Sequence, residues 1–239
     1  MKCKGAIFDM DGLLFDTERI YQQTWQEIAR ERGIELGGDF PKAISGTNGV
    51  YMCRVIETCY QVNDAHEIME ECMGRVRDKL SVYVPVKKGV HEILEFFRKS
   101  GIRMAVASSS AAEQIESNLE TAGIRGYFSA VVSGAEVRRG KPSPDIFLRA
   151  AERIGCAPGE CFVFEDSENG IKAGHAAGCM TIMIPDLVEA SFDIRPYCTE
   201  VYSDLLQAEE EIKERMMEVP GCRSKDSDSR FCFSGKCRT

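Results

Sequence analysis

Short apolar runs alternate with segments of helical periodicity along most of the chain. Five runs are short and apolar enough to form buried strands, at residues 4–8, 102–107, 128–132, 161–164 and 180–184. The spacing of apolar residues predicts helices at 89–100, 111–122, 144–155 and 168–177. Because strands that alternate with helices of this length are typical of βαβ units, we predict an α/β fold with a parallel sheet.

Residues 17–82 interrupt this alternation. Helical patterns follow one another there without a strand between them, at 17–32, 48–60 and 65–81. We therefore predict a small helical domain at 17–82, inserted after the first strand of a core made of 1–16 and 83–217. Residues 218–239 are rich in Ser, Lys, Arg, Asp and Cys and lack apolar periodicity, which predicts a disordered tail.

Composition narrows the range of partners and compartments. The net charge of −8 disfavours a nucleic acid polymer as a partner, because binding to a phosphate backbone requires a basic face. No apolar run approaches the roughly 20 residues of a membrane span. The 11 cysteines are scattered and form no C-x-x-C pair, so we expect free thiols and a reducing, cytoplasmic location.

Two acidic residues follow the first predicted strand at a spacing of two. In an extended backbone, Asp9 and Asp11 point the same way, so both carboxylates would face one site. Close carboxylates repel each other, and a hard divalent cation such as Mg²⁺ would relieve the repulsion through oxygen ligands. Acidic pairs at strand ends also cap turns, so this pair alone leaves both interpretations open.

Polar residues follow three other predicted strands. Ser108, Ser109 and Ser110 precede a helix, where they could bind an anion or one of them could cap the helix. Lys141 could neutralise a phosphate or be a solvated surface lysine. Glu165 and Asp166 could complete a metal site, or Asp166 or Ser167 could instead cap the next helix. Because the carboxyl ends of parallel strands share one edge of a sheet, the four groups together favour a single site.

These motifs resemble those of the haloacid dehalogenase superfamily of phosphohydrolases. The segment FDMDGLLFDTE at residues 8–18 matches the first motif of that family, and Ser108, Lys141 and the Glu165–Asp166 pair follow in the expected order. The resemblance extends from about residue 4 to 215. The helical insert resembles the cap of the beta-phosphoglucomutase-like branch, which combines a Rossmann-like core with a small four-helix cap.

The resemblance implies a role for each motif residue. Asp9 would be the nucleophile and a metal ligand, and Asp11 the general acid and base, with its backbone carbonyl on the metal. Ser108, Ser109 and Lys141 would hold the phosphoryl group. Asp166 would complete a Mg²⁺ site, with Glu165 as a ligand or a neighbour of the ligands.

Three positions distinguish a phosphatase from a mutase within this branch. Beta-phosphoglucomutases usually carry a His where this chain has Tyr21, an Arg in the stretch that corresponds to 46–49, and a Lys-Asn pair where Ala111 and Ala112 stand. Because a bisphosphate intermediate needs cations at both ends, we favour a phosphatase. A sugar phosphate mutase, with Arg19 or Arg54 supplying the charge, is the alternative, and a catalytically idle binding domain is a third interpretation.

The expected substrate is a small phosphorylated metabolite, either a sugar phosphate or a nucleoside monophosphate. Within the insert, Tyr21, Thr47 and Asn48 are the candidates for substrate selectivity. We expect a monomer that interacts neither with a membrane nor with nucleic acid.

Overall fold

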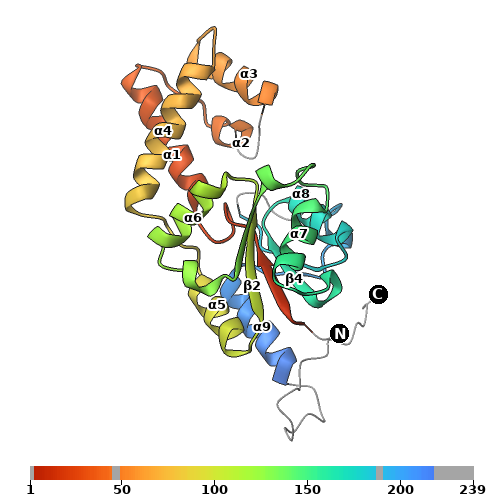
Figure 1. The fold of residues 1–239 in the computed structure, drawn as a ribbon. Coiled ribbons are helices and arrows are strands. Elements are labelled where there is room, and N and C mark those ends of the chain that lie inside the picture. Colours follow the sequence, from red (N-terminus) through yellow and green to blue (C-terminus); the bar gives the residue numbers. More distant parts are fainter. Residues whose placement is uncertain (1–2, 45–48, 187–190, 218–239) are drawn as a thin grey trace, which may run out of the picture. The chain divides into compact units, whose positions relative to one another are not determined.

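The structure of the protein is a computed structural model that describes residues 3–44, 49–186 and 191–217 (Figure 1). It separates into two compact units, with divisions between Phe15 and Asp16 and between Pro85 and Val86. We call the unit that contains the sheet the core unit and the unit between the two divisions the helical unit.

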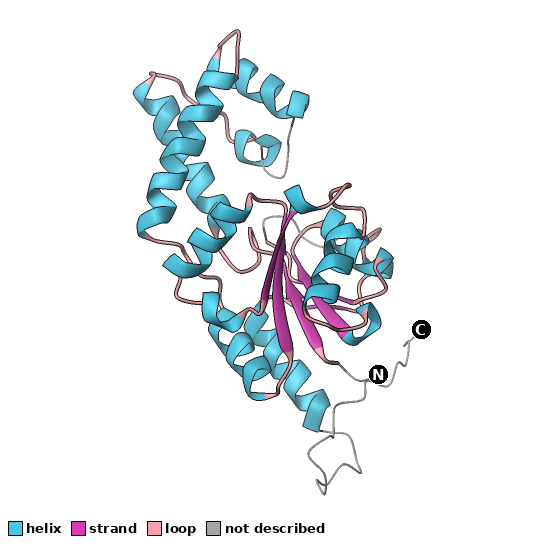
Figure 2. Cartoon of the chain, viewed as in Figure 1, coloured by secondary structure: helices cyan, strands magenta, loops and turns pink. Residues whose placement is uncertain are grey.

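The core unit is built on one parallel sheet of six strands in the order β3-β2-β1-β4-β5-β6 (Figure 2). The strands are β1 (Gly5–Phe8), β2 (Arg103–Ser108), β3 (Ala130–Ser133), β4 (Cys161–Glu165), β5 (Met180–Met183) and β6 (Glu200–Val201). The predicted α/β fold with a parallel sheet is confirmed. β1 lies between β2 and β4, so the acidic motif that follows it emerges in the middle of the sheet.

Helices cover both faces of the sheet. Figure 1 shows α7 (Asp145–Arg153) and α8 (Glu168–Ala176) on one side and α5 (Val90–Lys99) and α9 (Leu205–Met217) on the other, with α6 (Ala112–Thr121) beside β3. Both faces of β1 are therefore buried, which explains why it is an uninterrupted apolar run.

The two faces of β1 pack against different cores. The Ile7 side chain joins a hydrophobic cluster that contains Phe147 of α7. The next residue, Phe8, points to the opposite face, where its ring stacks on Phe164 at a centroid distance of 4.7 Å and meets Phe97 of α5 at 6.2 Å. Because both cores hold β1 by packing, the position of the residue that follows it is tightly fixed.

Two elements near the end of the described chain were not predicted from the sequence. β6 has only two residues, which is too short for a recognisable period. α9 packs against α5 and buries Leu205, Ala208 and Ile212, in a segment that also contains four glutamates. Both elements extend the core unit beyond the last predicted strand.

The helical unit consists of α1 (Thr17–Glu31), α2 (Phe40–Ile44), α3 (Gly49–Tyr60) and α4 (His66–Val82). The rings of Trp25, Phe40 and Tyr60 meet edge to face at centroid distances of 6.1–6.3 Å. The buried Tyr60 hydroxyl donates a hydrogen bond of 2.6 Å to the Trp25 carbonyl oxygen and so connects α3 to α1. The assignment of this unit as a cap over the site stays a prediction.

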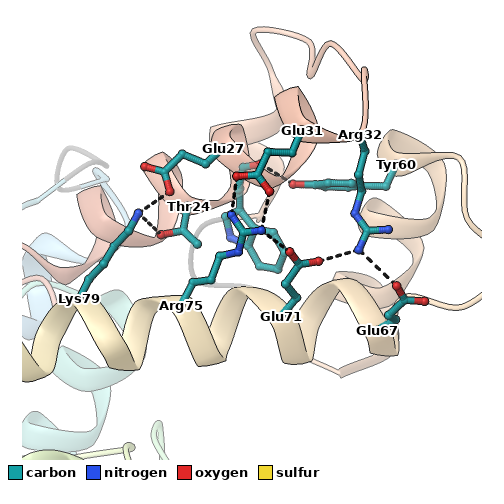
Figure 3. Close-up of polar contacts among 10 residues, drawn as sticks. Thr24, Glu27, Glu31, Arg32, Tyr60, Glu67, Glu71, Arg75 and Lys79 are labelled. Carbon is teal, nitrogen blue, oxygen red and sulfur yellow. Dashed lines mark hydrogen bonds and ion pairs between the residues drawn. The ribbon is translucent and has the colours of Figure 1, made fainter.

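A network of charged side chains joins α1 to α4 (Figure 3). The Arg75 guanidinium donates to both oxygens of Glu31 at 2.8 and 2.5 Å and to Glu71 at 2.5 Å, while Arg32 donates to the other oxygen of Glu71 at 2.6 Å. Such partly exposed pairs add little stability each. The packing energy between the two helices comes instead from buried apolar residues, among them Ile28 of α1 and Ile68, Val76 and Leu80 of α4.

No helix in the described parts of the chain is both long and apolar enough to span a membrane.

The Tyr60 hydroxyl provides a direct test of this packing. We expect Tyr60→Phe to lower the stability of the helical unit by about 1 kcal/mol, because a buried hydrogen bond is lost without a change in ring packing. The sequence contains a single tryptophan, Trp25, so urea unfolding followed by its fluorescence reports on this unit.

Tyr51→Phe is the matched control, because the Tyr51 side chain is 60% exposed. It should leave the unfolding midpoint unchanged. An equal midpoint for Tyr60→Phe and the wild type would contradict the assigned role of the hydroxyl.

Candidate active site

The polar residues predicted from the sequence gather at the carboxyl ends of three neighbouring strands. Asp9 directly follows β1, Ser108 is the last residue of β2, and Glu165 is the last residue of β4. The Asp9 amide donates to the Phe164 carbonyl oxygen at 3.0 Å, which continues the pairing of β1 with β4 up to the site. The side chains of Asp9, Ser108 and Glu165 are all buried.

Lys141 joins these strand ends. Its ammonium contacts an Asp9 carboxylate oxygen, donates to Glu165 Oε1 at 2.5 Å and lies 3.3 Å from the Ala107 carbonyl oxygen. The Phe147 ring lies beneath it at 5.1 Å. Lys141 is therefore a buried cation between two buried carboxylates, not a solvated surface lysine.

Burial and mutual repulsion shift the acid equilibria of this cluster. Burial raises the pKa of Asp9 to about 7, against the attraction of Lys141 and with the help of the Glu165 charge. The pKa of Asp166 is also raised well above its usual range by burial and by the charges of Glu165 and Asp9. Burial alone would lower the pKa of Lys141, but the two neighbouring carboxylates raise it, so this residue stays charged.

The turn after β1 brings Asp166 against the acidic motif. Gly12 has a φ of +83°, and a Cβ atom at this position would lie 2.3 Å from Asp166 Oδ2. Glycine is therefore required at residue 12 both for the backbone conformation and for the approach of the carboxylate. The same hypothetical Cβ would lie 3.4 Å from Asp186 Oδ2, so a second acid borders this turn.

Both carboxylate oxygens of Glu165 accept hydrogen bonds. Glu165 Oε1 accepts from Lys141, and Oε2 accepts from the amide and the hydroxyl of Ser167 at 3.0 and 2.9 Å. The Ser167 hydroxyl also accepts a hydrogen bond from the Gly170 amide at 3.1 Å and so caps α8. The prediction that Ser167 could cap this helix is therefore confirmed. These contacts favour a role for Glu165 in holding Lys141, and its role as a metal ligand stays a prediction.

The serine motif after β2 does not cap the helix that follows it. Ala111 occupies the N-cap position of α6, and no side chain there accepts a hydrogen bond from the helix. The serine hydroxyls have other partners: Ser108 Oγ accepts from the Ser110 amide at 3.1 Å, and Ser110 Oγ donates to Asp11 Oδ2 at 2.8 Å. Ser109 is exposed at the same edge of the sheet.

The donor set fits a hard divalent cation. The charges of Asp9 and Glu165 raise the pKa of Asp166, and those of Glu165 and Asp11 raise the pKa of Asp9, so bound positive charge would relieve repulsion at both residues. Within the described ranges, no group of three or more His, Cys, Asp or Glu side chains is arranged to hold a metal ion. Two carboxylates and the Asp11 backbone carbonyl would form a smaller set of protein ligands, as is usual for Mg²⁺, which keeps several waters.

The candidates for substrate selectivity belong to the segment between Asp16 and Pro85. Tyr21 is a half-buried residue of α1 in the helical unit. Thr47 and Asn48 lie outside the described residues. The selectivity of all three stays a prediction.

Comparison with known proteins settles the family. The sequence model of the haloacid dehalogenase-like hydrolase family matches residues 6–184 of this chain. The chain belongs to the haloacid dehalogenase-like hydrolase family. The resemblance inferred from the motifs is confirmed, and the protein is an enzyme of this hydrolase family.

Two named relatives and one solved structure place this hydrolase within the family. It is 34% identical to fructose-1-phosphate phosphatase YqaB of Escherichia coli over 178 residues, which are 73% of this chain and 92% of the relative. It is 33% identical to a protein named as a probable pseudouridine-5'-phosphatase of Drosophila melanogaster over 193 residues, 77% of this chain and 83% of the relative. A structure from Thermotoga maritima, provisionally assigned as a beta-phosphoglucomutase, has a TM-score of 0.78 at 25% identity and covers 88% of this chain and 99% of its own.

Three residues of this hydrolase border the site without having been predicted as part of it. Ser110 contacts Asp11, and Lys87 forms an ion pair with Asp186, the acid beside Gly12. The Lys87 amide also donates to the Leu14 carbonyl oxygen at 2.9 Å, which connects the segment after Val86 to the turn after β1. Ser110 was visible as the third serine of its motif, but no local pattern indicated the Lys87–Asp186 pair, whose partners are 99 residues apart.

The contact between Gly12 and Asp166 generates a prediction. We expect Gly12→Ala to lower the turnover of p-nitrophenyl phosphate by about 100-fold, because the added methyl group would displace the Asp166 carboxylate by an ångström or more. The positive φ should also cost about 1 kcal/mol of stability, which thermal unfolding measures.

Gly178→Ala separates these two effects. Gly178 has a φ of +79° and nothing within 4 Å of a hypothetical Cβ, so this variant should lose similar stability and keep full turnover. Equal turnover in both variants would contradict the proposed packing of Asp166 on Gly12.

Proposed function

We propose that this protein is a Mg²⁺-dependent phosphatase that hydrolyses a small phosphorylated metabolite through an aspartyl-phosphate on Asp9. The observation that carries the proposal is the buried Asp9 carboxylate, held against the Lys141 ammonium at the carboxyl end of β1. A sugar phosphate or a nucleoside monophosphate is the proposed substrate, and the names of the relatives support both classes.

Asp9 would act as the nucleophile. Its carboxylate forms a bond to phosphorus while the ester bond breaks, which divides hydrolysis into two steps. The Lys141 ammonium favours the ionised form of this carboxylate by its charge and would also attract the phosphate oxygens. Glu165 holds Lys141 from the other side, so the ammonium stays in place when substrate arrives.

Asp11 would carry the protons. In the first step, it gives a proton to the leaving oxygen of the substrate. In the second step, its carboxylate takes a proton from the attacking water, whose oxygen displaces Asp9 and releases inorganic phosphate. The residue ends each cycle protonated again.

Asp9, the Asp11 carbonyl and Asp166 would hold the cation. Bound Mg²⁺ supplies positive charge that stabilises the phosphate oxygens and offsets the repulsion among the carboxylates. Ser108 and Ser109, at the start of the segment that leads to α6, would bind the phosphoryl oxygens.

The relatives favour the phosphatase over the mutase alternative. The two relatives reported above carry phosphatase names, one of them as a probable phosphatase, and Ala111 and Ala112 add no charge next to the serine motif. We also propose a monomer in a reducing, cytoplasmic compartment, since all eight cysteines in the described part of the chain are free thiols.

The proposal predicts the behaviour of an Asp9→Asn variant. Release of inorganic phosphate from a panel of phosphorylated metabolites should fall by roughly 10⁴-fold or more, because an amide is a poor nucleophile. Removal of divalent cations with a chelator should abolish wild-type turnover, and Mg²⁺ should restore it.

Asp193→Asn is the matched control, because Asp193 is an exposed residue of the core unit. It should retain wild-type turnover. Full turnover of Asp9→Asn would refute the nucleophile, and production of an isomerised hexose phosphate without free phosphate would favour the mutase.

A further inference from the structure

Ser110 connects the second motif to the first. Its hydroxyl donates to Asp11 Oδ2 at 2.8 Å, between the segments that follow the neighbouring strands β1 and β2. Ser110 is half-buried, so this hydrogen bond is partly shielded from water. The bond holds the carboxyl group that the proposed function assigns to proton transfer.

A residue of β3 also fixes the position of Ser110. The buried Ser133 hydroxyl donates to the Ser110 carbonyl oxygen at 2.6 Å, and the Ser110 amide donates to Ser108 Oγ at 3.1 Å. A Cβ atom on Gly134 would lie only 3.1 Å from the backbone of Ser109, so the serine loop packs closely on the end of β3. The loop is thereby fixed at both its amide and its carbonyl group.

We propose that Ser110 is a positioning residue that orients Asp11 for proton transfer to the leaving group. The inference rests on the proposed function and deepens it. Because Oδ2 accepts the hydrogen bond from Ser110, it takes the carbonyl-like role in the protonated carboxyl group, and Oδ1 carries the catalytic proton. Ser133 keeps Ser110 in place and so acts indirectly on the same carboxyl group.

The proton transfer belongs to the first chemical step. An Asp9 oxygen forms the bond to phosphorus, the bond between phosphorus and the ester oxygen breaks, and the ester oxygen retains its electron pair. That oxygen then takes the proton from Asp11 Oδ1, so an alcohol leaves and Asp11 becomes a carboxylate. An alkoxide needs this proton to leave, whereas a nitrophenolate is stable enough to leave without it.

Two substrates that each carry one benzene ring separate these cases. Benzyl phosphate releases an alcohol, and p-nitrophenyl phosphate releases a nitrophenolate. We expect Ser110→Ala to lower kcat/KM for benzyl phosphate by about tenfold or more and for p-nitrophenyl phosphate by less than about threefold. The ratio kcat/KM is the appropriate measure because it reports the first step and excludes the later hydrolysis of the aspartyl-phosphate.

Two further variants control for folding and for the loss of a serine in general. Ser110→Thr retains a hydroxyl group and should restore much of the lost kcat/KM for benzyl phosphate. Ser129→Ala removes a hydroxyl that donates to the Met104 carbonyl oxygen at the far end of β2, and it should leave both substrates unaffected.

The outcomes distinguish this inference from the proposed function. A loss confined to benzyl phosphate supports the positioning role. Equal losses for both substrates, or no loss for either, would overturn it while leaving the phosphatase intact. Inactivity of the wild-type enzyme on both compounds and on the metabolite panel would overturn the proposed function and the inference together.

Discussion

The site depends on one buried ammonium between two buried carboxylates. Lys141 contacts Asp9 and donates to Glu165 at 2.5 Å, where all three side chains are almost inaccessible to water. Carboxylates that are buried close together favour their protonated, neutral forms. Burial and the neighbouring negative charges accordingly raise the pKa of Asp9 to about 7. The ammonium opposes that shift, and it therefore favours the ionised form that a nucleophile requires.

The parallel sheet explains why these groups meet. Asp9, Ser108 and Glu165 stand at the ends of strands that are adjacent in space but far apart in the sequence. Burial of β1 on both faces fixes Asp9, and the pairing of β1 with β2 and β4 fixes its distance from the other two residues. Loops supply the other parts of the site. One is the turn at Gly12, and another carries Lys141, which lies 132 residues from Asp9 in the sequence.

Much of this arrangement could be predicted from the sequence. The spacing of Asp9 and Asp11 after an apolar run indicated a shared site, and the order of the motifs indicated the family. Other features depend on contacts between distant segments, which no local pattern reveals. The serine motif illustrates this limit: Ser110 resembles a helix cap in sequence, but its hydroxyl binds Asp11, 99 residues away. β6 was too short for its period to be recognised.

We propose that Asp9, whose ionised form Lys141 favours, becomes covalently phosphorylated during turnover. Acid quenching during turnover, followed by borohydride reduction and peptide mass spectrometry, tests this directly, because reduction converts an aspartyl-phosphate into homoserine. We expect homoserine at position 9 when substrate is present and none when it is absent. Modification of another residue, or an unmodified position 9 during active turnover, would contradict it.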